Sequence, residues 1–256
     1  MVSEKRLSGL RPISRECNLA KITKIHEKRE IMKLLIVIPA FNEERVIADT
    51  VRGVKSVISK ESQILVVDDG SNDFTGELAK KAGAIVLRHP INRGLGGALG
   101  TGLYWAKVKD FDLCVTFDAD GQHDPSDLKK VLQPLYYNEA DVVIGTRTKT
   151  GWKEIPRDRK IILAVSNWLT WWLFGIKTSD SLSGFRAFNR RGIEKIQLRT
   201  DRMEVSNEFF SEIKRHRLRL AEVPIRVIYT NYSRSKGQKN SNAFSVGVKL
   251  VLRLFR

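Results

Sequence analysis

The stretch VTFDADGQHDP (115–125) begins as an apolar strand and ends in polar side chains suited to binding a cation. Asp118 and Asp120 are two positions apart at the strand end, so their carboxylates can project to the same side, and Gln122 continues that spacing. Mg²⁺ and Mn²⁺ prefer carboxylate, amide and phosphate oxygens to imidazole or thiolate ligands. We therefore predict that Asp118, Asp120 and Gln122 hold Mg²⁺ or Mn²⁺, and that this cation meets a diphosphate.

The end of the same stretch is typical of a helix start. Asp124 suits the N-cap, Pro125 the first helical position and Asp127 the first turn. This interpretation leaves His123 with no required role as a ligand. It does not account for the two earlier aspartates, which interrupt an apolar strand sooner than a cap requires.

A second acidic loop, VVDDGSNDFT (66–75), follows another apolar run. Asp69 can accept hydrogen bonds from a nucleobase or a ribose. The alternative is an Asp-Gly turn in which Asp73 caps the next helix, and the residues alone favour neither interpretation. The glycines of NRGLGGALGTG (92–102) fit neither the dinucleotide fingerprint nor the phosphate loop, so they predict a tight turn and close helix packing.

Alternating strand and helix patterns position these loops. We expect strands at 33–39, 63–69, 84–88, 112–118 and 141–145, and helices at 43–58, 73–81, 125–137 and after the glycine-rich turn. This alternation predicts an α/β fold with a mostly parallel, doubly wound sheet. In such sheets ligands bind beyond the carboxyl ends of the strands, which is where the polar loops fall.

The chain has 256 residues, 42% of them hydrophobic, and a formal net charge of +16. Its length suits one large domain, or one domain with an appendage. Acidic residues outnumber basic ones by 16 to 13 in 32–144, whereas basic residues outnumber acidic ones by 12 to 4 in 145–200 and by 12 to 5 in 201–256. The basic second half points to a polyanionic partner: nucleic acid, an anionic membrane surface or a phosphate-bearing substrate.

The mostly apolar run 161–176 bears on membrane contact. As a helix it would be roughly 24 Å long, which is short of the ~30 Å hydrocarbon core of a bilayer. Two interpretations stay open: a helix in the membrane interface with its tryptophans at headgroup level, or a helix packed on the domain. A basic amphipathic helix is expected over 241–256.

Residues 1–31 are charged throughout and lack the apolar stretch of a secretory signal. We expect them to be a mobile basic extension, or to reflect the choice of an upstream start codon. The two cysteines, Cys17 and Cys114, lie far apart and suggest neither a disulfide framework nor a zinc site. Cys114 is most simply a small buried residue, and the chain is expected to be cytoplasmic.

Seven motifs occur together in one order. They are PAFNEE (39–44), VVDDGSNDFT (66–75), NRGLGGALGTGL (92–103), DADGQHDP (118–125), GTR (145–147), SGFRAF (183–188) and EVPIRVIY (222–229). Together they resemble the inverting family-2 glycosyltransferases of the GT-A fold, in particular the dolichyl-phosphate mannose synthase and polyprenyl-phosphate glycosyltransferase group. The resemblance covers about Met32 to Lys239. It implies a Rossmann-like, mostly parallel central sheet flanked by helices, with a GT-A domain at 32–240 and amphipathic helices in the C-terminal half.

The resemblance also implies a role for particular residues. Those implied for the nucleotide sugar, with Asp69 on its base, are Pro39, Ala40, Phe41, Asn42, Glu43, Asp68 and Asp69. Asp118, Asp120 and Gln122 match a D-x-D-x-Q metal site that holds the nucleotide diphosphate, and Asp118, Asp120 and Arg147 are the implied catalytic residues. Those implied for the acceptor phosphate, near the loop of Gly184 and Phe185, are Arg147, Arg157, Arg159, Ser183, Arg234 and Lys236. An equally good interpretation is that Arg157 and Arg159 are solvent-exposed charged residues without a role in binding.

We therefore expect metal-dependent, inverting transfer of a hexose from a nucleotide-diphosphate sugar to a polyprenyl phosphate, by a peripheral protein at the cytoplasmic membrane face. If the acceptor is instead a saccharide hydroxyl, a carboxylate such as Asp120 or Glu204 must act as base. A nucleotidyltransferase is disfavoured because PAFNEE replaces the glycine- and arginine-rich loop that such an enzyme needs after its first strand. Nucleic acid is not an expected partner, since no helix-turn-helix pattern or aromatic–basic interleaving is present. Gly121 and Phe41 depart from the family pattern and leave the donor sugar open.

Overall fold

The computed structural model describes residues 32–147, 157–201 and 204–228, with the backbone alone at 157–159. Contacts divide the chain into two units, Met1–Ile31 and Met32–Arg256, and the fold below belongs to the second unit. The extension at 1–31 and the helix at 241–256 lie outside the described residues, so those parts of the expected domain division stay predictions.

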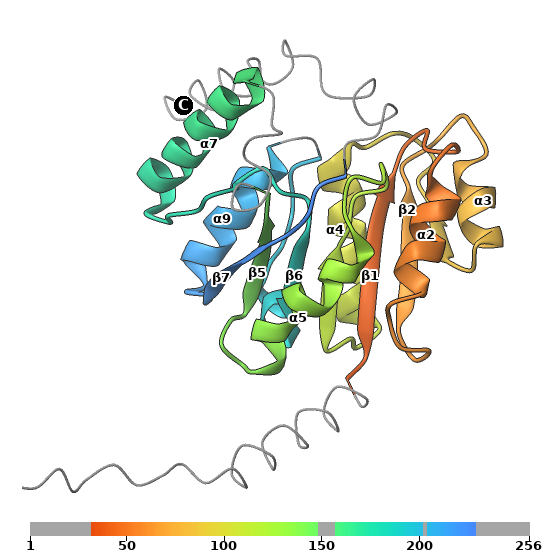
Figure 1. The fold of residues 1–256 in the computed structure, drawn as a ribbon, viewed down its shortest axis with the longest axis horizontal. Helices are drawn as coiled ribbons and strands as arrows, with labels where there is room; N and C mark the ends of the chain where they lie inside the picture. Colours follow the sequence, from red (N-terminus) through yellow and green to blue (C-terminus); the bar gives the residue numbers. More distant parts are fainter. Residues whose placement is uncertain (1–31, 148–156, 202–203, 229–256) are drawn as a thin grey trace, which may run out of the picture. The chain divides into compact units, whose positions relative to one another are not determined.

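A seven-stranded sheet forms the centre of this unit (Figure 1). Its strands are β1 (Leu34–Ala40), β2 (Gln63–Asp68), β3 (Ile85–Arg88), β4 (Leu113–Thr116), β5 (Val142–Thr146), β6 (Arg186–Asn189) and β7 (Leu220–Pro224), in the order β3-β2-β1-β4-β6-β5-β7. Only β6 runs antiparallel, between β4 and β5, whereas the other pairings are parallel. The predicted α/β fold with a mostly parallel sheet is confirmed.

Helices cover both faces of the sheet, as a parallel sheet requires (Figure 1). One face carries α2 (Ile47–Lys55), α3 (Thr75–Lys81) and α5 (Leu128–Tyr136), and the other carries α4 (Leu95–Val108), α8 (Arg190–Lys195) and α9 (Val205–Arg215). A longer helix, α7 (Arg157–Phe174), contacts α9, where Lys214 Nζ donates to the Leu173 carbonyl at 3.3 Å. Across the described ranges, no helix is long and apolar enough to cross a membrane.

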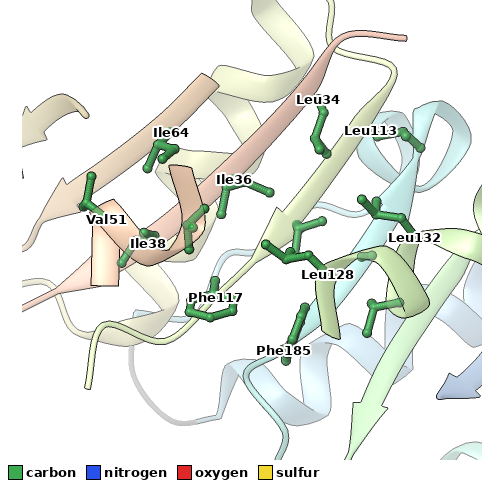
Figure 2. Close-up of a cluster of buried hydrophobic side chains, with 14 of the residues drawn as sticks. Leu34, Ile36, Ile38, Val51, Ile64, Leu113, Phe117, Leu128, Leu132 and Phe185 are labelled. Atoms are coloured by element: carbon green, nitrogen blue, oxygen red, sulfur yellow. The ribbon is translucent and has the colours of Figure 1, made fainter. Parts of the chain in front are cut away.

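Strand β1 shows how the apolar run builds two cores. Ile36 and Ile38 point to the layer of α2 and α5, where Figure 2 shows them with Val51 and Leu128. Val37, one position out of step, packs in the opposite core. Because alternate side chains of a strand point to opposite faces, a continuous apolar run fills both layers.

Some element boundaries differ from the sequence-based expectation. The helix expected at 43–58 spans only Ile47–Lys55, because Val46, with φ −129°, leaves helical geometry and separates it from a turn in which the Glu43 carbonyl accepts from the Val46 and Ile47 amides. The helix expected at 125–137 starts as a short 3₁₀ helix, η1 (Pro125–Asp127), before α5. The close glycine packing is confirmed, since a Cβ on Gly102 would lie 2.2 Å from Val37 Cγ1.

Asp141 stabilises the sheet at its β5–β6–β7 end. Its buried carboxylate accepts hydrogen bonds from the Arg219 amide at 2.9 Å and from Asn189 Nδ2 at 2.9 Å, and it pairs with the Arg219 guanidinium at 2.9 Å. The hydrogen bonds from Arg219 outweigh the effect of burial and hold the pKa of Asp141 well below its usual 3.8. The ionised carboxylate is therefore favoured by folding.

Asp141→Asn is expected to lower the free energy of unfolding by about 2 kcal/mol near neutral pH, because charged hydrogen bonds are lost in a buried site. A folded-state pKa below the unfolded value gives stability that is present above pH ~4 and is lost as the pH falls further. The difference between wild type and variant should therefore stay constant from about pH 7 to about pH 5 and shrink as the pH falls below about 4, as measured by urea unfolding. The control is Asp49→Asn on the exposed surface, which should change stability by less than ~0.5 kcal/mol. An Asp141→Asn variant as stable as wild type near pH 7 would contradict this role.

Candidate active site

The loops after β1 and β2 form a cross-linked platform at the carboxyl ends of the strands. The Asn42 amide donates to Ser71 Oγ at 3.0 Å, and Asn42 Oδ1 accepts from the Asn72 amide at 2.8 Å. The Glu43 amide donates to Thr75 Oγ1 at 2.8 Å. These bonds join two loops about thirty residues apart in sequence, so the platform is preorganised.

The residues predicted for the nucleotide sugar line this platform in different ways. Ala40 is buried and Pro39 half-buried at the end of β1, whereas Phe41 exposes 41% of its surface and offers an aromatic face on which a base can stack. Asp68 is fully buried, and its Oδ1 accepts from the Ser71 amide at 2.9 Å. Within the described part of the chain, Asp68 Oδ2 has no hydrogen-bond donor and lies 3.7 Å from Arg88 Nε.

Asp69 is directed at the glycine-rich turn. Its carboxylate accepts from the amides of Arg93 at 2.9 Å and Gly94 at 2.7 Å, and Oδ1 lies 2.7 Å from His89 Nδ1. His89 Nε2 in turn lies 2.9 Å from Thr101 Oγ1 on α4. Most of the acceptor capacity of Asp69 is thus used in holding the turn where α4 begins. A contact of Asp69 with the base stays a prediction.

Asp118 follows β4 with 35% of its side chain exposed and is held by a buried histidine. His123 Nε2 lies 2.9 Å from Asp118 Oδ2, and the His123 ring packs edge-on against Phe117 and beside Phe185. Burial alone would raise the pKa of Asp118, but the hydrogen bond from His123 and nearby positive charge outweigh it and hold the pKa below its usual value. Asp118 is therefore ionised and fixed in direction.

Asp120 lies close to Asp118, and its surroundings disfavour the ionised form of its carboxyl group. Burial, followed by the charge of Asp118 and with a smaller effect of Glu43, raises the pKa of Asp120 to about 6. The amide of Gln122 donates to Asp120 Oδ1 at 3.0 Å and orients the carboxylate. Two carboxylates that repel each other at one strand end are an arrangement that a cation would stabilise.

The donor set of this strand end fits Mg²⁺ or Mn²⁺ better than a structural metal. Among the described residues, no three histidine, cysteine, aspartate or glutamate side chains converge to hold an ion. Asp118 and Asp120 supply oxygen ligands only, and Mg²⁺ is commonly held by one or two carboxylates plus substrate phosphates. The residues therefore fit a cation that arrives with, or is completed by, a diphosphate.

The segment after β7 supports the turn that follows Asp120. The Ile228 amide donates to the Gln122 carbonyl at 2.8 Å, and Val227 forms an antiparallel bridge with His123. Asp127 lies in the first turn, as predicted, and its fully buried carboxylate also accepts from the Arg226 amide at 2.6 Å. Asp124 has the predicted N-cap role, with its side chain accepting from the Ser126 amide.

Two arginines, Arg147 and Arg186, lie within electrostatic reach of Asp118. Arg147 forms a two-pronged ion pair with the buried Asp180, with both nitrogen–oxygen distances at 2.7 Å. Arg186 is buried over the Phe209 ring at 4.3 Å, and its guanidinium donates to the Ser181 carbonyl at 3.1 Å. Burial, partly offset by Asp118 and Asp180, lowers the pKa of Arg186 to about 10. Arg186 remains a cation at neutral pH and adds positive potential near Asp118.

The loop that precedes β6 contains Ser183 and Gly184, and Gly184 lies against the Asp118 carboxylate. Ser183 Oγ donates to the Gly145 carbonyl at 2.6 Å, and the Gly184 carbonyl accepts from Thr116 Oγ1 at 2.7 Å. A Cβ on Gly184 would lie 2.2 Å from Asp118 Oδ1 and 2.4 Å from Oδ2. Only glycine at this position leaves space for the Asp118 carboxylate in its present orientation.

The structure brings part of the predicted site together. Asp118, Asp120, Glu43, Arg147 and Ser183 belong to one region at the carboxyl ends of β1, β4 and β5. The side chains of Arg157 and Arg159, and the whole of Arg234 and Lys236, lie outside the described residues. Four side chains next to predicted site residues had no role assigned from the sequence: His89 beside Asp69, His123 beside Asp118, Asp180 beside Arg147, and Arg186 near Asp118. His123 and Arg186 do stand inside conspicuous motifs, DADGQHDP and SGFRAF, and that position is the signal that could have found them.

Comparisons with known proteins agree with this geometry. The family model described as "Glycosyl transferase family 2" matches residues 35–197. The UDP-N-acetylglucosamine–dolichyl-phosphate N-acetylglucosaminyltransferase of Methanococcus voltae is 34% identical over 86% of this chain and 95% of its own length. The undecaprenyl-phosphate mannosyltransferase of Micrococcus luteus is 32% identical over 80% of this chain and 87% of its own. Glucosyl-3-phosphoglycerate synthase of Mycobacterium tuberculosis, solved with Mn²⁺, UDP and phosphoglyceric acid, aligns at TM-score 0.66 and 18% identity, covering 89% of this chain and 81% of that one, which indicates a shared fold.

Proposed function

The chain belongs to glycosyl transferase family 2, and from this premise we propose that it transfers a hexose from a nucleotide-diphosphate sugar to a polyprenyl phosphate of the dolichyl type. The observation that carries the proposal is the pair Asp118 and Asp120, two adjacent carboxylates that repel each other at the end of β4. Support for the acceptor comes from the two relatives, whose names specify dolichyl phosphate and undecaprenyl phosphate. We place the reaction at the cytoplasmic face of a membrane.

The proposed transfer needs little proton chemistry. An oxygen of the acceptor phosphate attacks the anomeric carbon, the bond from that carbon to the diphosphate breaks, and the nucleoside diphosphate leaves with the electron pair. In-line attack inverts the anomeric centre. A phosphate is already ionised near neutral pH, so no strong general base is required. Mg²⁺ or Mn²⁺ held by Asp118, Asp120 and Gln122 would supply charge stabilisation for the departing diphosphate.

The chain's own residues orient the reactants in this proposal. Phe41 and the platform after β1 and β2 receive the nucleoside, next to the buried Asp68. Arg147 and Arg186 add positive potential near Asp118, and in this proposal a phosphate acceptor approaches there. Because Asp180 already fixes Arg147, the guanidinium is preorganised and is not a freely moving contact.

Incubation with a panel of radiolabelled nucleotide sugars and polyprenyl-phosphate vesicles tests this function. We expect label from one donor to enter the organic phase on extraction, to require Mg²⁺ or Mn²⁺, and to be lost with a chelator. Reactions without protein, and with protein but without the lipid phosphate, are the controls. Label found only in water-soluble saccharide would overturn the lipid acceptor and favour a hydroxyl acceptor. If sugar transfer continued undiminished in the presence of the chelator, the proposed requirement for a divalent metal would be overturned.

A further inference from the structure

Helix α7 presents an apolar stripe to its surroundings. Ile161, Val165, Trp168 and Trp172 recur at spacings of four, three and four residues and expose 66, 50, 55 and 60% of their surfaces. The rings of Trp168 and Trp172 are stacked with their centroids 6.1 Å apart, and Trp171 beside them is 47% exposed. An exposed apolar stripe of this extent marks an interaction surface.

Three polar residues of α7, Ser166, Asn167 and Thr170, face the domain, and the apolar Leu163 is buried as well. Ser166 Oγ lies 2.8 Å from Ser181 Oγ, Asn167 Nδ2 donates to the Ser179 carbonyl at 2.9 Å, and the Ser181 amide donates to Asn167 Oδ1 at 2.9 Å. Thr170 is fully buried on the same side. These hydrogen bonds fix the rotation of the helix, so the apolar stripe is held outward.

The charges around α7 favour an anionic lipid surface over a protein groove as the occupant. The sequence from Ile161 to Ser179 contains no acidic residue, and the apolar run is flanked by four basic residues and one acidic residue: Arg157, Arg159, Lys160 and Lys177 against Asp158. Tryptophan is enriched at the membrane–water interface, and an interfacial helix combines such an apolar face with basic residues. Like the other helices of the described residues, α7 is not long and apolar enough to cross a bilayer.

The segment bonded to α7 leads into the candidate site. Asn167 holds Ser179 and Ser181, and between them Asp180 pairs with Arg147. We propose that the outward face of α7 docks on an anionic lipid bilayer and so presents the segment 178–183 to a phosphate headgroup in that bilayer. The identity of the headgroup as the acceptor rests on the proposed function, whereas the docking itself does not.

Vesicle binding by the full chain tests the docking. The variant Trp168→Gln with Trp172→Gln removes two outward rings and keeps helix-forming side chains. The matched control is Tyr104→Gln with Val108→Gln, which removes two exposed apolar side chains of α4, 68% and 57% exposed. Flotation uses vesicles of phosphatidylcholine with and without phosphatidylglycerol. We expect the α7 variant to lose on the order of tenfold in partitioning to the anionic vesicles, while the control binds as wild type.

Other readouts separate docking from folding, from self-association and from the proposed function. Brominated lipids should quench the tryptophan fluorescence of wild type, and transfer to a short-chain, water-soluble prenyl phosphate should survive in the α7 variant. Wild-type vesicle binding by the variant would overturn the proposal. Two other results would also overturn it: a wild-type dimer that becomes a monomer in the variant, or the absence of quenching by brominated lipids. In those cases the stripe would be covered by a second copy of the chain or by residues 241–256. Vesicle binding without any lipid product would leave docking intact and overturn only the proposed function.

Discussion

Asp118→Asn is expected to reduce sugar transfer roughly 10³-fold at saturating Mn²⁺, with a similar loss for Asp120→Asn. A unit charge pair at ~4 Å and an effective dielectric near 20 is worth about 4 kcal/mol, and each ~1.4 kcal/mol is a factor of ten in rate. Asparagine keeps the shape of either side chain but removes the charge that opposes the cation. Steady-state transfer with the donor identified by the panel, and direct titration of Mn²⁺ binding, are the measurements.

The matched control for both variants is Asp124→Asn in the same turn. Asp124 caps η1 through the Ser126 amide, and asparagine caps helices about equally well, so transfer should stay within about twofold of wild type. All three variants should melt within a few degrees of wild type. If Asp118→Asn and Asp120→Asn bind Mn²⁺ and transfer sugar like Asp124→Asn, the two carboxylates are not the metal ligands.

The sheet could be predicted because the sequence features that specify its strands are local in the chain. The run from Leu34 to Ala40 is apolar at every position and is buried on both faces, and alternating helices force parallel neighbours. The antiparallel β6 had no such signal, since Arg186–Asn189 is short and contains a buried arginine. Its place between β4 and β5 depends on pairings with residues more than forty positions away.

The candidate site could be predicted only where a motif carries its own chemistry. Asp118 and Asp120 stand out because two acids interrupt an apolar strand, but the dependence of Asp118 on His123 is a matter of packing against Phe117 and Phe185. The contact of Asp69 with a base stays a prediction, but nothing in the local sequence indicates that its carboxylate accepts from amides 24 and 25 residues further along the chain. Such tertiary partners leave no trace in local spacing.

The charge asymmetry of the sequence has a structural counterpart around Asp118. Asp118 and Glu43, acids from the first half, both raise the pKa of Asp120, and arginines from the second half, Arg147 and Arg186, lie within electrostatic reach of Asp118. Each set alone would be unfavourable: the acids raise the pKa of Asp120, and burial lowers the pKa of Arg186. Together they fit the proposed function, in which a cation and a phosphate acceptor would lie next to each other.

Gly184→Ala is expected to lower metal-dependent transfer by about 10²-fold without unfolding the protein. The new Cβ would lie 2.2 Å from Asp118 Oδ1, and the backbone of Gly184 cannot retreat easily because its carbonyl accepts from Thr116 Oγ1 at 2.7 Å. The Asp118 side chain must therefore rotate and give up its bond to His123. A displacement of about 1 Å in a reacting group can cost about 10²-fold in rate. The measurements are the Mn²⁺ dissociation constant, the transfer rate and the melting temperature.

The matched control is Gly100→Ala, which adds the same methyl group within α4. There the nearest atoms are the Leu198 carbonyl at 3.5 Å and Leu198 Cβ at 3.7 Å, an ordinary contact, and alanine is the better helix former. Gly100→Ala should keep wild-type transfer and melt at the same or a slightly higher temperature. Gly184→Ala should keep most of its thermal stability, because the clash is with a side chain that can rotate into the open site. If Gly184→Ala binds Mn²⁺ and transfers sugar as wild type does, the orientation of Asp118 seen here is not the one that transfer requires.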